Sequence, residues 1–294
     1  MAAALPVARP WALAHADARD DDDDDEATDD DDATDDDEAT DDEEDEDQPP
    51  VTAGGLYTLA TYPRGEVQRP LSMTLGILEL RAAVGADMSN AHAFGSAGGA
   101  LAARYGLRDN VELRADAACT YDCRGFEVGV AVEGSLDYDL VDLRAGVAVA
   151  RSLRYQGATV SADDVAVTLP IGVPFRYAVA PQLAVTARET AIAIDPTGTP
   201  DATPCVAITI QPRPVVAIIL RAHAVIPDFD FGSDKIAIPA SAAVQITPGN
   251  RWDTGAELRF IDLRVPQHLD LDADGKDDAY YDARFLSLFV RLRR

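Results

Sequence analysis

The chain has 294 residues, a formal net charge of −27 at pH 7 and 47% hydrophobic residues. Most of the charge lies in one place: residues 1–49 hold 23 acidic and two basic residues, whereas the remaining 245 hold 29 acidic and 23 basic ones. Residues 50–294 are too close to electrical neutrality to attract nucleic acid, and the acidic segment before them would repel phosphate groups. No run of 18 apolar residues occurs, so no membrane-spanning helix is predicted.

The first fifty residues divide into two segments. Residues 1–18 end in alternating small residues up to Ala18, which resemble an export cleavage pattern, although Arg9 and Pro10 break the short apolar stretch before them. We therefore expect a truncated export signal. Residues 19–50 form an acidic linker that like-charge repulsion should keep disordered. A solvated tether, a cation sponge of low affinity and a docking tail for a basic partner are the alternatives for its role.

From Met73 onward, apolar residues recur with a period of two. In residues 141–149, for example, one face reads Val, Leu, Ala, Val, Val and the other Asp, Arg, Gly, Ala. Such alternation predicts β-strands with one apolar and one polar face. Residues 51–294 should therefore form an all-β domain of twelve strands, with approximate cores at 75–86, 96–105, 111–119, 126–135, 141–151, 164–173, 183–194, 205–211, 215–225, 236–246, 254–263 and 284–292.

The connections between these strands also alternate. Five are tight turns rich in Gly, Pro, Asn and Asp, at 106–110, around Tyr138-Asp139, at 175–182, at 212–214 and at 247–250. The others are longer and more polar, at 87–95, 152–163, 195–204, 226–235 and 264–283, with the tip at Cys119–Cys123 as the short exception. Turns at one end and loops at the other indicate an up-and-down antiparallel transmembrane β-barrel. An even strand number would place both termini on the turn side.

Aromatic residues support this interpretation, because they fall at or beyond the ends of the expected strands. Examples are Tyr105, Tyr138, Tyr155, Tyr177, Tyr280, Tyr281, Trp252 and Phe175. In a lipid bilayer such residues form girdles at the two interfaces.

The segments that flank the expected strands resemble those of uncharacterised outer-membrane β-barrel proteins of Gram-negative bacteria. They are residues 62–71, Tyr-Pro-Arg-Gly-Glu-Val-Gln-Arg-Pro-Leu, and residues 283–294, where Leu286, Leu288, Val290 and Leu292 alternate. The resemblance covers about residues 57–294. It implies export, contact with outer-membrane lipid and insertion by the barrel-assembly machinery. With both termini on the turn side, the acidic tail would lie in the periplasm. The resemblance implies no activity, and the chain departs from the common pattern by ending in two Arg.

Two features predict irregular strands. Pro170 and Pro239 fall inside expected strands, where each would remove a ladder hydrogen bond. The apolar phase also slips around Arg188-Glu189, which indicates a β-bulge.

In a membrane barrel the polar face of each strand lines the lumen. The expected lumen-lining residues are Glu79, Arg81, Glu112, Arg114, Asp116, Glu127, Glu133, Asp142, Arg144, Arg221, His223, Glu257 and Arg259. Both signs occur in similar numbers, so these groups should pair with one another. A narrow lumen filled by ion pairs is favoured over a wide water-filled pore, and a twelve-stranded barrel accommodates either.

The last expected loop contains the start of a calcium-binding pattern. The candidate ligands are the carboxylates of Asp270, Asp272, Asp274 and Asp278 and the carbonyl of Lys276. Gly275 would supply the sharp bend, but Tyr281 stands where an EF-hand has its bidentate Glu. The sequence therefore offers a candidate Ca²⁺ site or an acidic surface loop.

Cysteine usage is compatible with export. Cys119 and Cys123 bracket three residues at an expected hairpin tip, where they could form a disulfide in an oxidising compartment. Without a further Cys or a nearby His, the pair is a poor zinc site.

Catalysis has little support, so we expect a protein that is not an enzyme. No Gly-x-Ser-x-Gly elbow is present, and of the four His only His223 falls on the polar face of a strand. The main hypothesis is thus a narrow channel or structural barrel. A soluble secreted β-sandwich or barrel that binds Ca²⁺ or a small ligand is the first alternative, and a barrel hydrolase is the second. The sequence does not indicate an oligomeric state.

Overall fold

A computed structural model describes residues 57–88, 94–137, 139–151, 153–156, 159–162, 164–189, 191–196, 198–232, 236–260, 263 and 284–294. The chain divides into two units, residues 1–48 and 49–294, and every described residue belongs to the second. The expected export signal and acidic linker therefore lie outside the described residues. Within the described part, no helix is long and apolar enough to span a membrane.

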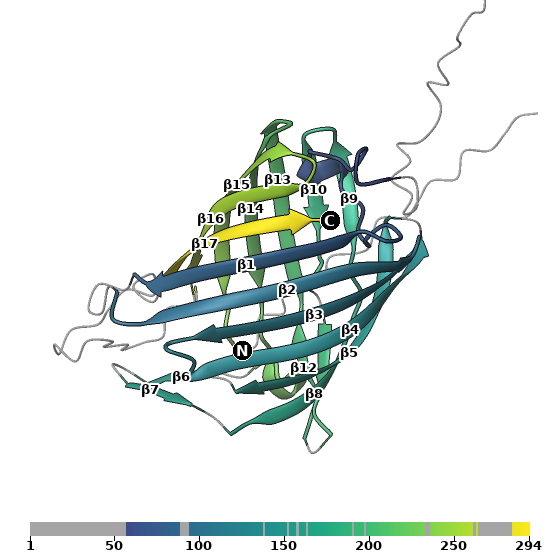
Figure 1. The fold of residues 1–294 in the computed structure, drawn as a ribbon. Helices are drawn as coiled ribbons and strands as arrows, with labels where there is room; N and C mark the ends of the chain where they lie inside the picture. The colour runs from purple at the N-terminus through teal and green to yellow at the C-terminus, as the bar shows by residue number, and fades with distance from the viewer. Residues whose placement is uncertain are drawn as a thin grey trace, which may run out of the picture. The chain divides into compact units, whose positions relative to one another are not determined.

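The described chain is almost entirely antiparallel β-structure (Figure 1). Its strands are β1 (Leu78–Asp87), β2 (Ala97–Arg108), β3 (Val111–Thr120), β4 (Gly125–Asp137), β5 (Val141–Arg151), β6 (Leu153–Gln156), β7 (Thr159–Ala162), β8 (Ala166–Gly172), β9 (Arg176–Ala180), β10 (Leu183–Thr186), β11 (Ala191–Ile194), β12 (Asp201–Thr203), β13 (Cys205–Arg213), β14 (Val216–His223), β15 (Ala240–Gly249), β16 (Trp252–Phe260) and β17 (Arg284–Arg293). Two 3-10 turns, η1 (Glu66–Gln68) and η2 (Pro227–Phe229), complete the elements.

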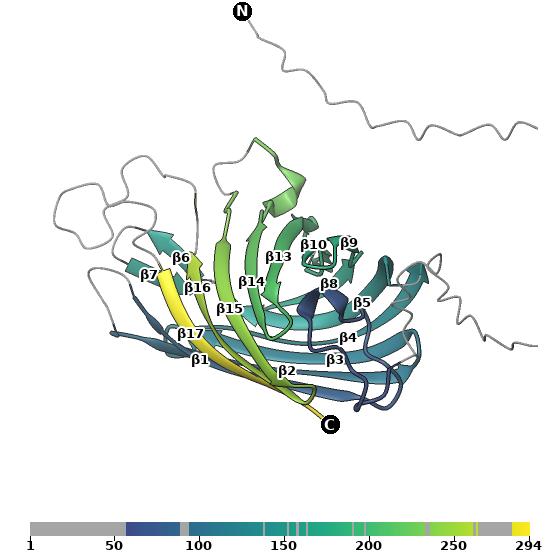
Figure 2. The same ribbon diagram turned by 90° about the horizontal axis from the view of Figure 1, so that it is seen from above.

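Fifteen of these strands form one sheet, in the order β12-β11-β8-β5-β4-β3-β2-β1-β17-β16-β15-β14-β13-β10-β9. The two ends of this order are halves of the same three strands, since β8 runs on into β9, β10 into β11, and β12 into β13. β8 pairs with β11 and β9 with β10, while β12 and β13 pair with β11 and β10. The sheet therefore closes into a barrel of twelve strands, three of them interrupted, which is the number expected from the sequence (Figure 2).

One end of the barrel, here called the turn end, carries the tight turns at 109–110, 181–182, 214–215 and 250–251. The C-terminal residue Arg294 is at this end too. Its backbone exchanges two hydrogen bonds of 2.8 Å with that of Leu78, which pairs with Tyr105 near the turn at 109–110. The opposite end, here called the loop end, carries the longer connections. The alternation of turns and loops expected from the sequence is thus confirmed for the described residues.

Three details of the expected strands needed correction or explanation. The turn expected at 175–182 is wrong: β9 occupies Arg176–Ala180, and only residues 181–182 turn. Pro239 lies just before β15 rather than inside it. Pro170 does lie in β8, and the β5–β8 ladder has no pairs between Ala145↔Ile171 and Ala148↔Thr168, because proline has no N–H to donate.

The interruption expected near Arg188-Glu189 is present, because the strand breaks there into β10 and β11. The break lets two successive charged side chains face the lumen, which an unbroken strand could not do. Both Arg188 and Glu189 therefore line the cavity inside the barrel.

Apolar side chains on the strands point out of the barrel. Leu288 in β17 is 60% exposed and Val84 in β1 is 68% exposed, while Phe289 and Glu79, which point inward from the same two strands, are each 5% exposed. The same holds around the barrel for Leu80, Leu101, Leu113, Val128, Val130, Val132, Leu143, Val147, Val167, Ile208, Leu220, Val244, Ile246, Leu286, Val290 and Leu292. We call this surface the apolar belt. A soluble sandwich would bury these side chains, so that alternative does not describe the fold.

Candidate functional site

The lumen of the barrel is entered from the turn end by the chain that precedes β1. We call residues 57–77 the inserted segment; it contains η1 and is seen in purple inside the barrel in Figure 2. Several of its side chains are among the most buried of the described residues, with Val67 and Leu71 each 1% exposed and Arg69 2% exposed. The sequence did not predict this insertion, because the segment has neither helical nor strand periodicity.

Polar side chains from three sides of the barrel hold the backbone of the inserted segment. The N–H of Val67 donates to Gln211 Oε1 of β13 at 2.9 Å. The N–H of Met73 donates to Glu112 Oε2 of β3 at 2.6 Å, and that of Leu71 donates to Asp139 Oδ1 at 2.5 Å. These bonds satisfy backbone donors that burial removes from water, so they fix the path of the segment across the lumen.

Arg69 is the main charged anchor of the inserted segment. Its Nη1 and Nη2 atoms donate to the two oxygens of Asp253 in β16, at 2.9 and 2.8 Å. Arg69 also pairs with Glu66, and it donates to Thr247 Oγ1 at 3.3 Å. A fork-shaped guanidinium and a carboxylate that are both buried make a geometrically specific contact.

Glu66 completes this anchor from within the inserted segment. Gln245 Nε2 donates to its Oε2 atom at 2.8 Å, and Arg291 Nη1 lies 3.2 Å from the same oxygen. Burial alone would raise the pKa of Glu66, but Arg69, Arg291 and Arg188 together hold it well below the ordinary value of 4.5. Glu66 is therefore a carboxylate wherever the segment is inserted.

The base of the inserted segment is a small apolar cluster of Tyr62, Met73 and Ile77. The guanidinium of Arg293 lies 4.9 Å from the centre of the Tyr62 ring, and burial raises the pKa of the Tyr62 hydroxyl. The chain can lie this close to β2 because residue 106 is glycine: a Cβ atom there would be 2.0 Å from the carbonyl oxygen of Thr74. The segment and the barrel wall are thus fitted to each other.

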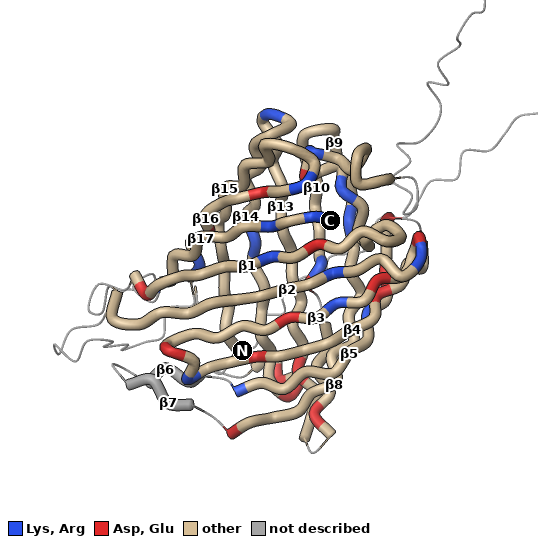
Figure 3. Tube along the Cα trace, in the orientation of Figure 1, with Lys and Arg blue, Asp and Glu red and all other residues tan. Residues whose placement is uncertain are grey.

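Beyond the inserted segment, buried carboxylates each collect two or three arginines from neighbouring strands. Glu79 lies 2.9 Å from Arg293, 3.7 Å from Arg291 and 3.8 Å from Arg104. Glu257 lies 3.2 Å from Arg81, 3.3 Å from Arg221 and 3.9 Å from Arg259. Apart from the pair of Glu257 with Arg259, which lie on the same strand, these ion pairs join strands that are first or second neighbours in the sheet. Figure 3 shows the charged positions recurring along β1, β3 and β17.

A second pair of carboxylates lies on β3 and β4. Glu112 is 2.7 Å from Arg104 and 3.7 Å from Arg114, and Glu133 is 2.8 Å from Arg114 and 2.7 Å from Arg144. Both carboxylates are almost wholly buried. Such groups are stable in a dry wall only when they are paired as they are here.

These arginines and glutamates surround a cavity of about 170 Å³ in the lumen. Of the residues predicted from the sequence, Glu79, Arg81, Arg114, Arg221 and Glu257 line it. Charged lining residues that the sequence analysis missed are Glu66, Arg104, Arg176, Arg188, Glu189 and Arg291. Arg104 and Arg291 fall on the inward-facing positions of their strands, as Glu79 does. The alternation of polar and apolar residues could therefore have identified these two.

The other predicted lumen residues do not line the cavity and are distributed towards the two ends of the barrel. Towards the turn end lie Glu112, Glu133, Asp142 and Arg144, and from mid-strand towards the loop end lie Asp116, Glu127, His223 and Arg259. Two of them hold buried atoms without a hydrogen-bond partner in the described part of the chain, namely both oxygens of Asp142 and Nδ1 of His223. The structure therefore gathers only part of the predicted set around one space.

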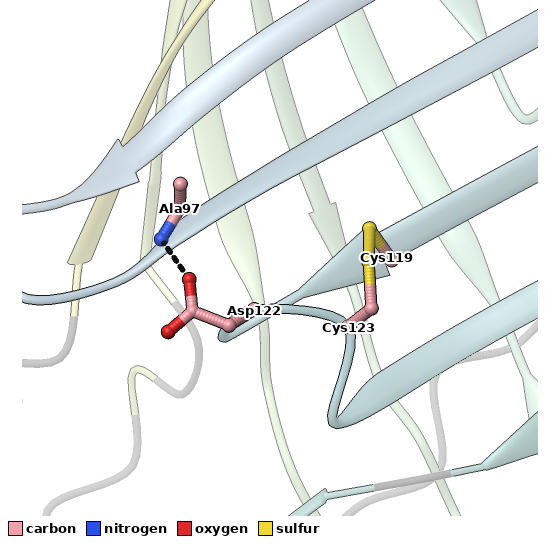
Figure 4. The surroundings of a disulfide bond; sticks show 4 residues. All are labelled: Ala97, Cys119, Asp122 and Cys123. Atoms are coloured by element: carbon pink, nitrogen blue, oxygen red, sulfur yellow. Dashed lines mark hydrogen bonds between the residues drawn. A yellow bond between two sulfur atoms is a disulfide. The ribbon is translucent and has the colours of Figure 1, made fainter.

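The predicted disulfide is present at the loop end. Cys119 and Cys123 are joined, and the residues Tyr121, Asp122 and Cys123 at this tip all have positive φ (Figure 4). Asp122 Oδ1 accepts the N–H of Ala97 at 3.0 Å, which ties the tip to the start of β2. The candidate Ca²⁺ ligands Asp270, Asp272, Asp274, Lys276 and Asp278 lie outside the described residues.

No family model matches the sequence, and no curated protein matches it. Solved structures with a similar fold include outer-membrane porins and channels. The NanC porin is 11% identical, with 74% of this chain and 99% of that chain covered and a TM-score of 0.47. The KdgM porin is 8% identical, with coverages of 74% and 98% and a TM-score of 0.46. An outer membrane channel from Pseudomonas putida F1 is 10% identical, with coverages of 76% and 97% and a TM-score of 0.45.

Proposed function

We propose that this chain is an outer-membrane β-barrel of a Gram-negative cell that acts as a narrow channel or a structural barrel, rather than as an enzyme. The observation that supports the proposal most is the distribution of polarity: the apolar belt faces outward, while ionised groups and a cavity lie inside. A protein in water would have to hide that belt, whereas lipid solvates it. The barrel-assembly machinery would insert it, with β17 as the amphipathic final strand.

In this proposal the charged lumen is paired with itself and partly filled by the inserted segment. Glu66 and Arg69 of that segment complete ion pairs with groups on β16 and β17, so the segment and the wall neutralise one another. Only small polar solutes would pass, through the space between the wall and the segment. The acidic linker would then extend from the turn end into the periplasm, where it could tether a basic partner.

Conductance measurements on the full-length protein, refolded in detergent and reconstituted in planar bilayers, test the channel. We expect small, stepwise and ohmic currents from the wild type. An Arg69→Ala variant should conduct more, because it loses the anchor to Asp253. Zero conductance from both proteins at all voltages, with the folded band intact on a detergent gel, would contradict the channel and leave the structural barrel.

A further inference from the structure

The cavity presents positive charge, although the lumen as a whole is nearly balanced. The carboxylates are set back into the wall: the side chains of Glu257 and Glu79 are 4% and 7% exposed. Two arginines that pair with Glu257 are more exposed, with 32% of the Arg81 side chain and 26% of the Arg221 side chain accessible. In this part of the cavity a solute would therefore meet guanidinium groups before it meets Glu257.

The formal charge of the lining agrees with this difference in exposure. Seven arginines and four glutamates line the cavity. Among the four glutamates of the lining, Glu189 is the exposed one, with 51% of its side chain accessible, and it lies 3.7 Å from Arg221. In a space with low-dielectric walls, this excess attracts anions more strongly than it would in open water.

Within this lining, Arg81 and Arg291 form an unusual pair. They are direct partners in the β1–β17 ladder, which places two like charges opposite each other, an arrangement that destabilises a sheet unless something compensates. Arg104 and Arg114 are also direct partners, but Glu112 lies between them, 2.7 Å from one and 3.7 Å from the other. The two arginine pairs thus differ in whether a carboxylate bridges them.

No carboxylate of the described residues bridges Arg81 and Arg291. Arg81 leans over the Phe289 ring, 4.8 Å from its centre, and reaches Glu257. Arg291 reaches instead towards Glu66, Glu79 and Asp253. The Nε atoms of both arginines are buried and lack a hydrogen bond within the described part of the barrel, although that of Arg291 lies 3.7 Å from Glu79 Oε1. Each guanidinium thus has carboxylates of its own, and none of these lies between the two like charges.

We propose that the cavity beside Arg81 and Arg291 binds a small oxyanion, either a carboxylate or a phosphate. Two guanidinium forks on adjacent strands offer several N–H donors to the oxygens of one anion, and both anion types accept such forks. The size agrees, because a cavity of roughly 150 Å³ holds a molecule as large as benzene. The permeation of such anions rests on the proposed channel function, but their binding does not.

Ligand-observed NMR on the refolded full-length protein tests the site with two probes. Inorganic phosphate is followed by ³¹P line broadening, and acetate by saturation transfer from the protein to its methyl protons. We expect at least one probe to bind the wild type, and the probe that responds identifies the oxyanion. Binding should fall at least 10-fold in Arg81→Gln. It should fall less in Arg81→Lys, which keeps the charge but loses the planar fork.

Arg259→Gln is the matched control, because Arg259 also pairs with Glu257 but takes no part in the Arg81–Arg291 pair. Binding retained in this variant and lost in Arg81→Gln supports the site. Equal loss of binding in both variants would show that the overall positive charge of the lumen, and not the Arg81–Arg291 pair, attracts the anion, and this would overturn the proposal. Absence of binding of either probe to the folded wild type would overturn it as well. Binding without conductance would contradict the channel alone.

Discussion

The two halves of the lumen use the same alternating strand pattern in different ways. In the turn-end half, Glu112 and Asp253 are completely buried, and each contacts arginines together with the inserted segment. In the loop-end half, Asp116 and Glu127 also lie at inward positions, but they are exposed, and no ion pair joins them to another described residue. The difference is the inserted segment, which excludes water from one half only.

The contribution of an inward-facing carboxylate to stability therefore depends on which half of the lumen it occupies. A carboxylate in the turn-end half depends on its partners, because no water is available to solvate it. A carboxylate in the loop-end half is solvated and should tolerate substitution.

Arg69→Ala should have the largest effect, because it leaves Glu66 and Asp253 short of a buried cation. Breaking a buried ion pair in this way costs about 3–5 kcal/mol, which should release the inserted segment. The Arg64 side chain is exposed but the next residue, Gly65, is buried, so trypsin should cleave after Arg64 faster in the folded variant than in the folded wild type. Arg259→Ala, which removes a half-exposed arginine, is the control and should cost less than about 1 kcal/mol. Wild-type resistance to trypsin in Arg69→Ala would show that Arg69 is not the anchor.

Gly106→Ala should separate the inserted segment from the wall by steric conflict rather than by charge. The new Cβ atom would be 2.0 Å from the carbonyl oxygen of Thr74, and backbone on both sides leaves no flexible group to move. Overpacking of this kind costs about 1–3 kcal/mol. The temperature at which the folded gel band converts to the unfolded one should fall. It should not change in Gly249→Ala, since a Cβ atom at residue 249 has nothing within 4 Å.

Acidification should weaken the inserted segment through Glu66. Its pKa is depressed when inserted, so the inserted state binds fewer protons than the released one, and the stabilisation is fully present above a pH of about 4.5. It is lost as the pH falls through the lower pKa of the inserted state. The groups that face Glu66 are Arg69, Arg188, Arg291 and Gln245.

Conductance measured from pH 7 down to pH 3 should accordingly rise below about pH 4.5. Glu66→Gln should begin from a higher conductance at pH 7 and respond less to acid. A wild-type conductance that does not change over this range would show that Glu66 does not hold the segment in place.

Glu127→Gln should have the smallest effect. It removes an exposed carboxylate of the loop-end half, so stability should change by about 0.5 kcal/mol or less. Glu112→Gln is its counterpart in the turn-end half, where the amide would leave Arg104 and Arg114 without their shared carboxylate. Equal shifts of the unfolding temperature in Glu127→Gln and Glu112→Gln would show that the two halves of the lumen do not differ in their dependence on inward carboxylates.

Much of the barrel was predictable from the sequence, because its signal is local. Alternation and turn chemistry gave the strand number, and the interruptions at Pro170 and Arg188-Glu189 were visible as breaks in a periodic pattern. β9 was missed because Pro174 and the break at residues 173–175 disguise the continuation of β8 as a turn.

The arrangement inside the lumen was less predictable, because it depends on contacts between distant parts of the chain. Arg81 meets Arg291 only because the first strand pairs with the last. Residues 57–77 carry polar and charged groups without a period, and nothing local indicates that Arg69 will be buried against Asp253. The pattern predicts which face is polar, but not which polar groups a second segment will cover.

We expect β17 to have one side in lipid and the other towards the lumen. Nitroxide labels on Ser287→Cys and Leu288→Cys test it, in reconstituted full-length protein with Cys205→Ser as background; Cys119 and Cys123 are already joined. We predict that dissolved oxygen, which concentrates in lipid, relaxes the label at residue 288 more. A water-soluble nickel complex should relax the label at residue 287 more. Equal responses at the two positions, or a protein that is soluble in water without detergent, would show that β17 does not face lipid.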